Sequence, residues 1–145
     1  FNCPFSNQSI VDIGAGAGFP SIPLKIVYPD LKITIVDSLN KRITFLNHLF
    51  KELNLKDCQA IAMRGEDYAL KHREQADVVM ARAVARLNIL DEICLPLVKK
   101  DGYFLSLKGR QGNDDDHRSH ILIKKVKLTP AKYPRQFAKI KKKPL

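Results

Sequence analysis

The chain has 145 residues, 45% of them apolar, and its 25 Lys and Arg outnumber its 15 Asp and Glu to give a formal net charge of +10. This length and apolar share predict one compact domain with a hydrophobic core, and they exclude a disordered chain. No apolar run approaches the ~18 residues that a membrane span needs, and the first residues do not resemble a secretory leader, so we expect neither a membrane protein nor a secreted one.

The cysteine pattern bears on redox environment and metal binding. Cys3, Cys58 and Cys94 are odd in number, form no Cys-x-x-Cys pair and show no ligand spacing with the four His. A disulfide scaffold or a metal site is therefore not expected, and a reducing, cytoplasmic location is predicted. Cys94 falls in a predicted helix, where we expect it to be a core residue.

The charge is distributed unevenly along the chain. Residues 1–117 hold 15 basic and 15 acidic residues, whereas residues 118–145 hold ten basic residues and no acidic one. A neutral body followed by a cationic segment favours binding to a polyanion, and we expect nucleic acid. The alternative is a solvated segment that only aids solubility.

Short apolar runs alternate with longer amphipathic ones in the body of the chain. Ser38 is the expected N-cap of the second helix, and Asp101-Gly102 is the expected turn before the fifth strand. In chain order we expect strands at 10–13, 32–36, 58–63, 76–81, 103–107 and 118–126. We expect helices at 20–28, 38–54 and 87–98, and a short helix or turn at 66–72. This alternation predicts an α/β class with a doubly wound, mostly parallel sheet, and a ligand outside the carboxyl ends of its strands.

A glycine-rich turn directly follows the first expected strand. Gly14, Gly16 and Gly18 are spaced Gly-x-Gly-x-Gly, Phe19 follows them and Asp12 precedes them. This differs from the Gly-x-Gly-x-x-Gly pattern of dinucleotide-binding proteins. It resembles the first motif of S-adenosylmethionine-dependent methyltransferases, whose cofactor carries a sulfonium and an amino-acid end rather than a pyrophosphate. The alternative is a generic glycine turn in an α/β protein.

Asp37 ends the second expected strand, 23 residues after Gly14. In a fold of this class an acidic side chain at that place binds the ribose hydroxyls of a nucleoside. Asp37 also fits a role at the start of the following helix, and an NAD-dependent enzyme would carry the same residue. It therefore supports a nucleoside ligand without choosing between cofactors.

Several motifs occur in a fixed order along the chain, at residues 14–23, 36–46, 64–67, 81–85, 107–109 and 132–135. Together they resemble one family, the bacterial RsmG (GidB) proteins, which are 16S ribosomal RNA guanine-N7 methyltransferases. The resemblance covers nearly the whole chain. It implies a Rossmann-like class I methyltransferase fold with S-adenosylmethionine as cofactor.

The resemblance also implies particular contacts to the cofactor. Gly65 and Glu66, after the third strand, are expected beside the adenine, although Glu66 is also suited to a helix N-terminus. Arg82, at the end of the fourth strand, is expected to bind the cofactor carboxylate or a substrate phosphate, the alternative being a structural salt bridge to Asp12 or Asp77. The complete predicted cofactor set is Asp12, Gly14, Gly16, Gly18, Phe19, Asp37, Gly65, Glu66 and Arg82.

The predicted partner is ribosomal RNA or the small ribosomal subunit, bound by a monomer. Cationic side chains would contact phosphates, while Tyr133 and Phe137 would stack on exposed bases. The predicted RNA-binding residues are Lys41, Arg42, Lys108, Lys124, Lys125, Lys132, Tyr133 and Arg135.

Guanine N7 carries a free lone pair and loses no proton when it attacks a methyl group. No general base is therefore needed, and no catalytic side chain is predicted, because alignment supplies much of the rate. Two other functions remain open. One is an RNA-binding ribosome assembly factor that keeps a non-catalytic cofactor fold, and the other is an NAD-dependent oxidoreductase, against which the glycine spacing argues.

The chain departs from the family pattern in two places. The family carries a helical segment before the first strand, and a helix and a strand between the positions of Lys108 and Arg118, where only nine residues occur here. Either this chain is shorter, or residues are missing from the sequence at that point. We expect residues 1–108 to form the cofactor-binding core and residues 109–145 to form a late strand and a basic C-terminal segment.

Overall fold

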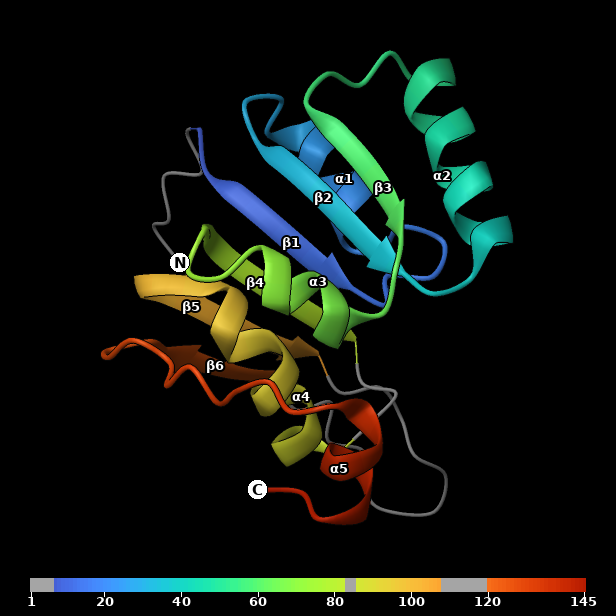
Figure 1. Cartoon of the computed structure of the whole chain (residues 1–145). Coiled ribbons are helices and arrows are strands. Elements are labelled where there is room, and N and C mark those ends of the chain that lie inside the picture. Colours follow the sequence, from blue (N-terminus) through green and yellow to red (C-terminus); the bar gives the residue numbers. More distant parts are fainter. Residues whose placement is uncertain (1–6, 83–85, 108–119) are drawn as a thin grey trace, which may run out of the picture.

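The computed structural model describes residues 7–82, 86–107 and 120–145. The elements are β1 (Ser9–Ile13), α1 (Ser21–Val27), β2 (Lys32–Asp37), α2 (Asn40–Glu52), β3 (Cys58–Ala62), α3 (Gly65–Lys71), β4 (Ala76–Arg82), α4 (Leu87–Cys94), the 3-10 turn η1 (Leu95–Leu97), β5 (Val98–Leu107), β6 (His120–Lys124) and α5 (Phe137–Lys142). The strands form a single sheet in the order β3-β2-β1-β4-β5-β6, with helices on both faces (Figure 1). The predicted α/β, doubly wound class is confirmed.

The strand pairing determines where a ligand can bind. β1 to β5 are all parallel, and only β6 runs antiparallel, against β5. β1 lies between β2 and β4, so the chain builds one half of the sheet outward from β1 and then returns to its other side. In such sheets the crevice for a ligand forms at this reversal, outside the carboxyl ends of the strands.

The helices pack on the two faces because side chains alternate along each strand. On one face α1 and α2 bury Ile22, Leu46 and Phe50 against Ile33 and Ile35 of β2. Each apolar side chain buried in this way stabilises the fold by about 1.5–3 kcal/mol relative to exposure. The rigid sheet between two such layers holds the strand ends in place.

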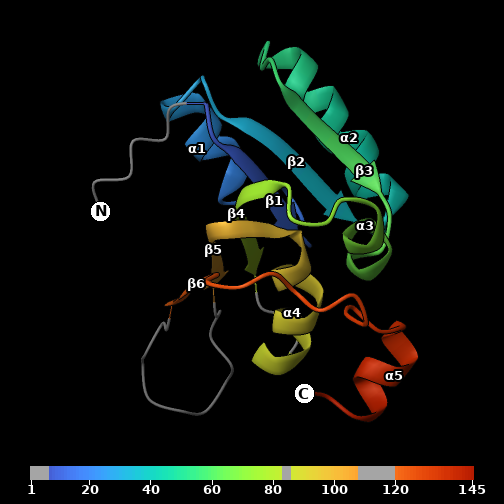
Figure 2. The ribbon, with the colours of Figure 1, turned by 60° about the vertical axis from the view of Figure 1, so that its left-hand side comes forward.

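The opposite face carries α3, α4 and α5. Tyr68 of α3, Ile93 of α4 and Ile140 of α5 pack with Phe104 of β5 in one core cluster. Cys94 belongs to this cluster and is fully buried, so its prediction as a core residue is confirmed. Figure 2 shows the C-terminal segment running past α4 to reach α5.

Two expected boundaries before the fifth strand are wrong. The helix expected to reach residue 98 ends at Cys94, and a 3-10 turn containing Pro96 follows, because proline cannot donate the hydrogen bond that would continue the helix. The expected turn at 101–102 lies within β5, where the pairing register shifts and Asp101 has a φ of +68°. At Gly102 a Cβ would lie 2.6 Å from the Asp77 carbonyl oxygen, so the glycine permits a close backbone approach.

Two other local features differ from expectation. Ser38 is not the N-cap of α2, because the helix begins after Leu39. The Leu39 N–H donates a hydrogen bond to the carboxylate of Asp37. Helix α5 was not predicted, because six residues rich in lysine carry little periodic signal. Within the ranges that the structure describes, no helix combines the length and apolar character needed to cross a lipid bilayer.

Candidate functional site

The glycine turn after β1 provides an open cradle. Gly14, Gly16 and Gly18 have φ angles of +72°, +60° and +94°, a region that side chains rarely adopt. A Cβ at Gly14 or Gly16 would meet no atom within 4 Å, whereas a Cβ at Gly18 would lie 2.4 Å from Ile22 Cδ1. The first two glycines therefore leave space for a ligand, and Gly18 lets the turn pack on α1.

The turn is attached to the neighbouring strand. The Gly14 N–H donates to the Val36 carbonyl at 2.8 Å, so the turn meets the carboxyl end of β2. Phe19, the last residue of the turn, is 55% exposed and thus available to cover a ligand. The cradle therefore lies at the strand ends, where the strand order predicts a binding crevice.

Asp12 is a fully buried carboxylate beneath this turn. One oxygen, Oδ2, accepts a hydrogen bond from the Ser21 hydroxyl, while Oδ1 has no partner within the described part of the chain. Burial raises the pKa of Asp12 to about 7, an effect that Ser21 and the positive charge of Arg82 partly offset. A buried carboxylate with an unused oxygen is suited to a cationic or hydrogen-bonding group of a ligand. The sequence did not single out Ser21 as its partner.

Asp37 ends β2 beside the turn and is 5% exposed. Its Oδ1 accepts from the Leu39 N–H at 2.9 Å, and its Oδ2 accepts from Arg42 Nη1 at 3.1 Å. Both roles considered for Asp37 are compatible, because each carboxylate oxygen has further lone pairs for ribose hydroxyls. Arg42, predicted to bind RNA, is half exposed and is ion-paired to Asp37.

Gly65 and Glu66 follow β3 and begin α3. A Cβ at Gly65 would lie 3.0 Å from both Ile13 and Ile93, so the backbone packs closely there. Glu66 is 6% exposed and accepts a hydrogen bond from Arg64 Nε at 2.8 Å. Its place in the first turn of α3 also agrees with the alternative role at a helix N-terminus. Arg64 lies in the motif at residues 64–67, but its contact with Glu66 was not predicted.

Arg82 is exposed at the end of β4. In the described chain, Arg82 forms no ion pair with Asp12 or Asp77. Asp12 is bound there by Ser21, and Asp77 is bound by Ser9 and Lys99. The alternative of a structural salt bridge to these two residues is therefore wrong. Its guanidinium still acts electrostatically on Asp12, which agrees with a place at the crevice.

Taken together, these side chains and glycines fit a nucleoside with an amino-acid end. Glycines leave room for the ligand, acidic side chains lie at the ends of β1, β2 and β3, and Arg82 lies at the end of β4. Within residues 7–82, 86–107 and 120–145, no group of three or more His, Cys, Asp or Glu is arranged to hold a metal ion.

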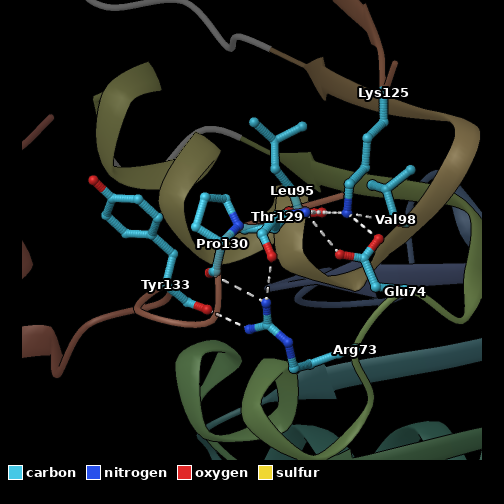
Figure 3. Close-up of polar contacts among 8 residues, drawn as sticks. All are labelled: Arg73, Glu74, Leu95, Val98, Lys125, Thr129, Pro130 and Tyr133. Carbon is cyan, nitrogen blue, oxygen red and sulfur yellow. Dashed lines mark hydrogen bonds and ion pairs between the residues drawn. The ribbon is translucent and has the colours of Figure 1, made fainter. Parts of the chain in front are cut away.

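The basic C-terminal segment is fixed to the body by the loop between α3 and β4, as Figure 3 shows. The Arg73 guanidinium donates to the carbonyl oxygens of Thr129, at 2.9 Å, and of Tyr133. Glu74 accepts the Thr129 N–H at 2.9 Å and forms an ion pair with Lys125. Residues 125–133 of this segment are thus held against the body of the protein.

Two of the predicted RNA-binding cations have partners inside the protein. Lys125 is 5% exposed, and besides Glu74 its ammonium donates to the carbonyl oxygens of Leu95 and Val98 at 2.8 and 2.6 Å (Figure 3). Arg135 makes two 2.7 Å hydrogen bonds to the fully buried Glu92 carboxylate, whose pKa is lowered mainly by these bonds. The charges of Lys125 and Arg135 are therefore offset within the protein, which argues against a role for either residue in RNA binding.

The remaining predicted RNA-binding residues differ in accessibility. Lys41, Lys124 and Lys132 are exposed, and the Lys132 ammonium lies 5.1 Å from the centre of the partly exposed Tyr133 ring. Lys108 lies outside the described residues. The cationic segment also exposes the side chains of Lys127, Lys139, Lys141, Lys142 and Lys143.

The network of Figure 3 predicts a large effect of Lys125→Ala on stability. The alanine leaves Glu74 and two carbonyl oxygens without their donor, so we expect the free energy of unfolding to fall by about 3 kcal/mol. Urea denaturation measures this, with Lys124→Ala, an exposed neighbour, as the control that changes it by less than about 0.5 kcal/mol. Equal effects of the two substitutions would show that the buried ammonium does not hold the segment.

Comparison with solved structures shows the class of fold. A SAM-dependent methyltransferase from Aquifex aeolicus superposes with a TM-score of 0.60 at 16% identity, covering 77% of this chain and 62% of that one. Coclaurine N-methyltransferase bound to N-methylheliamine and SAH also gives 0.60 at 16% identity, over 71% of this chain and 31% of that one. The chain therefore has the Rossmann-like fold that these methyltransferases share.

Comparison of sequences gives the family. The profile of the family described as rRNA small subunit methyltransferase G matches residues 2–142. The ribosomal RNA small subunit methyltransferase G of Macrococcus caseolyticus is 50% identical over 166 residues, which cover 95% of this chain and 70% of that protein. This chain belongs to the rRNA small subunit methyltransferase G family, as its motifs predicted.

A second relative bears on the expected gap. The protein of the same name from Staphylococcus epidermidis is 48% identical over 174 residues, an alignment that covers the whole of this 145-residue chain and 73% of that protein. Because the alignment is longer than the chain, the relative holds internal residues that this chain lacks. This agrees with a gap near residues 108–118, whether the chain is shorter or residues are missing from the sequence there, although the alignment length does not locate the gap.

Proposed function

We propose that this chain transfers a methyl group from S-adenosylmethionine to guanine N7 in 16S ribosomal RNA. The observation that carries the proposal is the joint presence, at the carboxyl ends of β1 to β3, of the open glycine cradle and the buried acidic side chains. Membership of the rRNA small subunit methyltransferase G family supports the ribosomal RNA substrate. We further propose that the protein acts in the cytoplasm as a monomer.

The proposed role of each cofactor residue follows from its position. Gly14 and Gly16 leave space for the cofactor, with Gly18 shaping the turn, and Phe19 covers it. Asp37 binds the ribose hydroxyls, and the Gly65 and Glu66 region binds the adenine. Asp12 accepts a hydrogen bond from the amino-acid end, directly or through water, and Arg82 binds the carboxylate of that end or a substrate phosphate.

When bound, S-adenosylmethionine supplies an electrophilic methyl group on a sulfonium. The chain's contribution is then to hold the donor and the guanine in line, because N7 attacks with its own lone pair. No proton leaves N7 in this step, so no general base is required, and alignment supplies much of the rate. The acidic side chains of the crevice act through binding and orientation.

Methyl incorporation tests the proposal directly. Purified protein with labelled S-adenosylmethionine is expected to label 16S ribosomal RNA from cells that lack this activity, as naked RNA or as small subunits. Nuclease mapping with mass spectrometry should place the label on guanine N7, and Gly14→Val is the inactive control. Unlabelled RNA that nevertheless binds tightly would instead support a ribosome assembly factor.

RNA binding is expected to depend steeply on salt, because exposed lysines release counterions when they contact phosphates. Replacing Lys141, Lys142 and Lys143 together with serine should make the negative slope of log K against log salt shallower by about 2. Fluorescence anisotropy over a salt series measures the slope. The control replaces Lys51 and Lys56, exposed near the end of α2 and the following loop, and should leave it unchanged. A slope that is flat, or equally reduced in both variants, would contradict binding by this segment.

A further inference from the structure

One side chain joins the proposed adenosine end of the crevice to the C-terminal helix. Arg64 precedes α3, and its Nε donates to Glu66 Oε1 at 2.8 Å. The Arg64 Cζ also lies 4.6 Å from the centre of the Phe137 ring, which begins α5. Phe137 is thus 71 positions away from Glu66 in sequence, but only the Arg64 side chain lies between them.

The two contacts use different parts of the guanidinium. The N–H groups lie in its plane and bind the carboxylate, whereas its flat face attracts an aromatic ring. Lysine cannot replace both contacts, because an ammonium has neither a planar face nor a fork of N–H groups. The Arg64 guanidinium is therefore held in one orientation only when both the carboxylate and the ring are present.

Glu66 depends on this orientation. Its side chain is 8% exposed, and in the part of the chain described here Arg64 is its hydrogen-bond partner. A nearly buried carboxylate without its cationic partner would reorient toward solvent. The direction in which Glu66 presents its second oxygen is thus set by Arg64.

The position of the Phe137 ring is fixed in turn by the core. Phe137 packs against the cluster beneath α3 and α4, and Ile140 of the same helix is fully buried in it. Arg135, just before α5, is held by Glu92 of α4. The ring is therefore a fixed surface against which Arg64 rests.

We propose that Phe137, Arg64 and Glu66 form a positioning relay, through which the C-terminal helix sets the affinity for the cofactor without touching it. This inference rests on the proposed function, because it takes Glu66 as a cofactor residue. Arg64 and Phe137 are positioning residues that act only through the Glu66 carboxylate. The C-terminal helix then serves cofactor binding as well as carrying cationic residues.

Calorimetric titration of the full chain with S-adenosylhomocysteine tests the relay. Phe137→Leu removes the ring and is expected to weaken binding about two- to fivefold, the range of a partly exposed cation–π contact. Phe137→Tyr keeps the ring and should retain the affinity. Arg64→Ala and Arg64→Lys are both expected to weaken binding about tenfold, because neither preserves the fork and the face together.

A double substitution separates the relay from a general loss of stability. Phe137→Leu should have no further effect on affinity in the Arg64→Ala background, since the ring acts through Arg64. Ile140→Val is the matched control, because it weakens the packing of α5 without changing the ring, and it should lower the melting temperature but leave the affinity unchanged.

The outcomes distinguish this inference from the proposed function. If the wild-type chain binds S-adenosylhomocysteine and Phe137→Leu binds it equally well, the relay is wrong and the proposed function stands. A Phe137→Leu effect that persists without Arg64, or that Ile140→Val reproduces, overturns the relay in the same way. If the wild-type chain does not bind the compound, the proposed function and the relay both fail.

Discussion

Gly14→Val is expected to weaken the binding of S-adenosylhomocysteine by at least about a hundredfold, a change of about 2.7 kcal/mol. Apart from the adjoining residues, a Cβ at Gly14 would meet no protein atom within 4 Å, so a valine side chain would enter the volume left for the ligand. Gly14 also has a φ of +72°, where a β-branched residue costs the fold about 1–2 kcal/mol. Calorimetry measures the affinity, and urea denaturation measures the stability.

Asn54→Val is the matched control for this prediction. Asn54 follows α2, far from the carboxyl ends of the strands, and has a φ of +51°. Valine there carries a comparable backbone strain without entering the crevice, so stability should fall while affinity stays the same. Equal affinity of Gly14→Val and the wild-type chain would remove the glycine turn from the binding site.

Asp12→Asn is expected to change how stability depends on pH. Burial raises the pKa of Asp12 to about 7 from 3.8. The raised pKa contributes stability that is fully present below about pH 3.8 and is lost as the pH rises to about 7, because the folded chain keeps a proton that the unfolded chain has released. Between pH 5 and pH 8 the free energy of unfolding of the wild-type chain should fall by about 2–3 kcal/mol from this cause. The Asp12→Asn variant should not show this fall, because asparagine does not titrate.

The measurement is urea unfolding of both proteins at several pH values. The difference in free energy of unfolding, variant minus wild type, should rise by that amount between pH 5 and pH 8, whatever constant cost asparagine adds. The difference isolates Asp12, because all other titrating groups are common to both proteins. A difference that is constant with pH would show that the carboxylate is ionised in the fold without penalty.

Much of the fold was predictable from local pattern. Apolar runs ending at the glycine turn and at Asp37 predicted β1 and β2, and strand–helix alternation predicted a parallel sheet with its ligand at the carboxyl ends. The positive φ angles at Gly14 and Gly16 agree with the use of glycine there. These features were predictable because each depends on residues close together in the sequence.

What could not be predicted depends on partners distant in sequence. Lys125 and Arg135 belong to a cationic run, and nothing nearby indicates that Glu74 and Glu92, 51 and 43 positions earlier, bind them inside the protein. Glu74 and Glu92 belong to residues 1–117, where the charges balance, whereas Lys125 and Arg135 belong to the cationic residues 118–145. Folding brings them together, so that net charge by segment overstated the number of cations available to RNA.

A crystal structure of the chain with S-adenosylhomocysteine is the most direct test of the central claim. We expect the compound to lie across the carboxyl ends of β1 and β2, with its ribose at Asp37, its adenine beside Gly65 and Glu66, and its amino-acid end above Asp12. A compound bound at another surface, or an empty crevice in crystals grown at saturating concentration, would contradict the account.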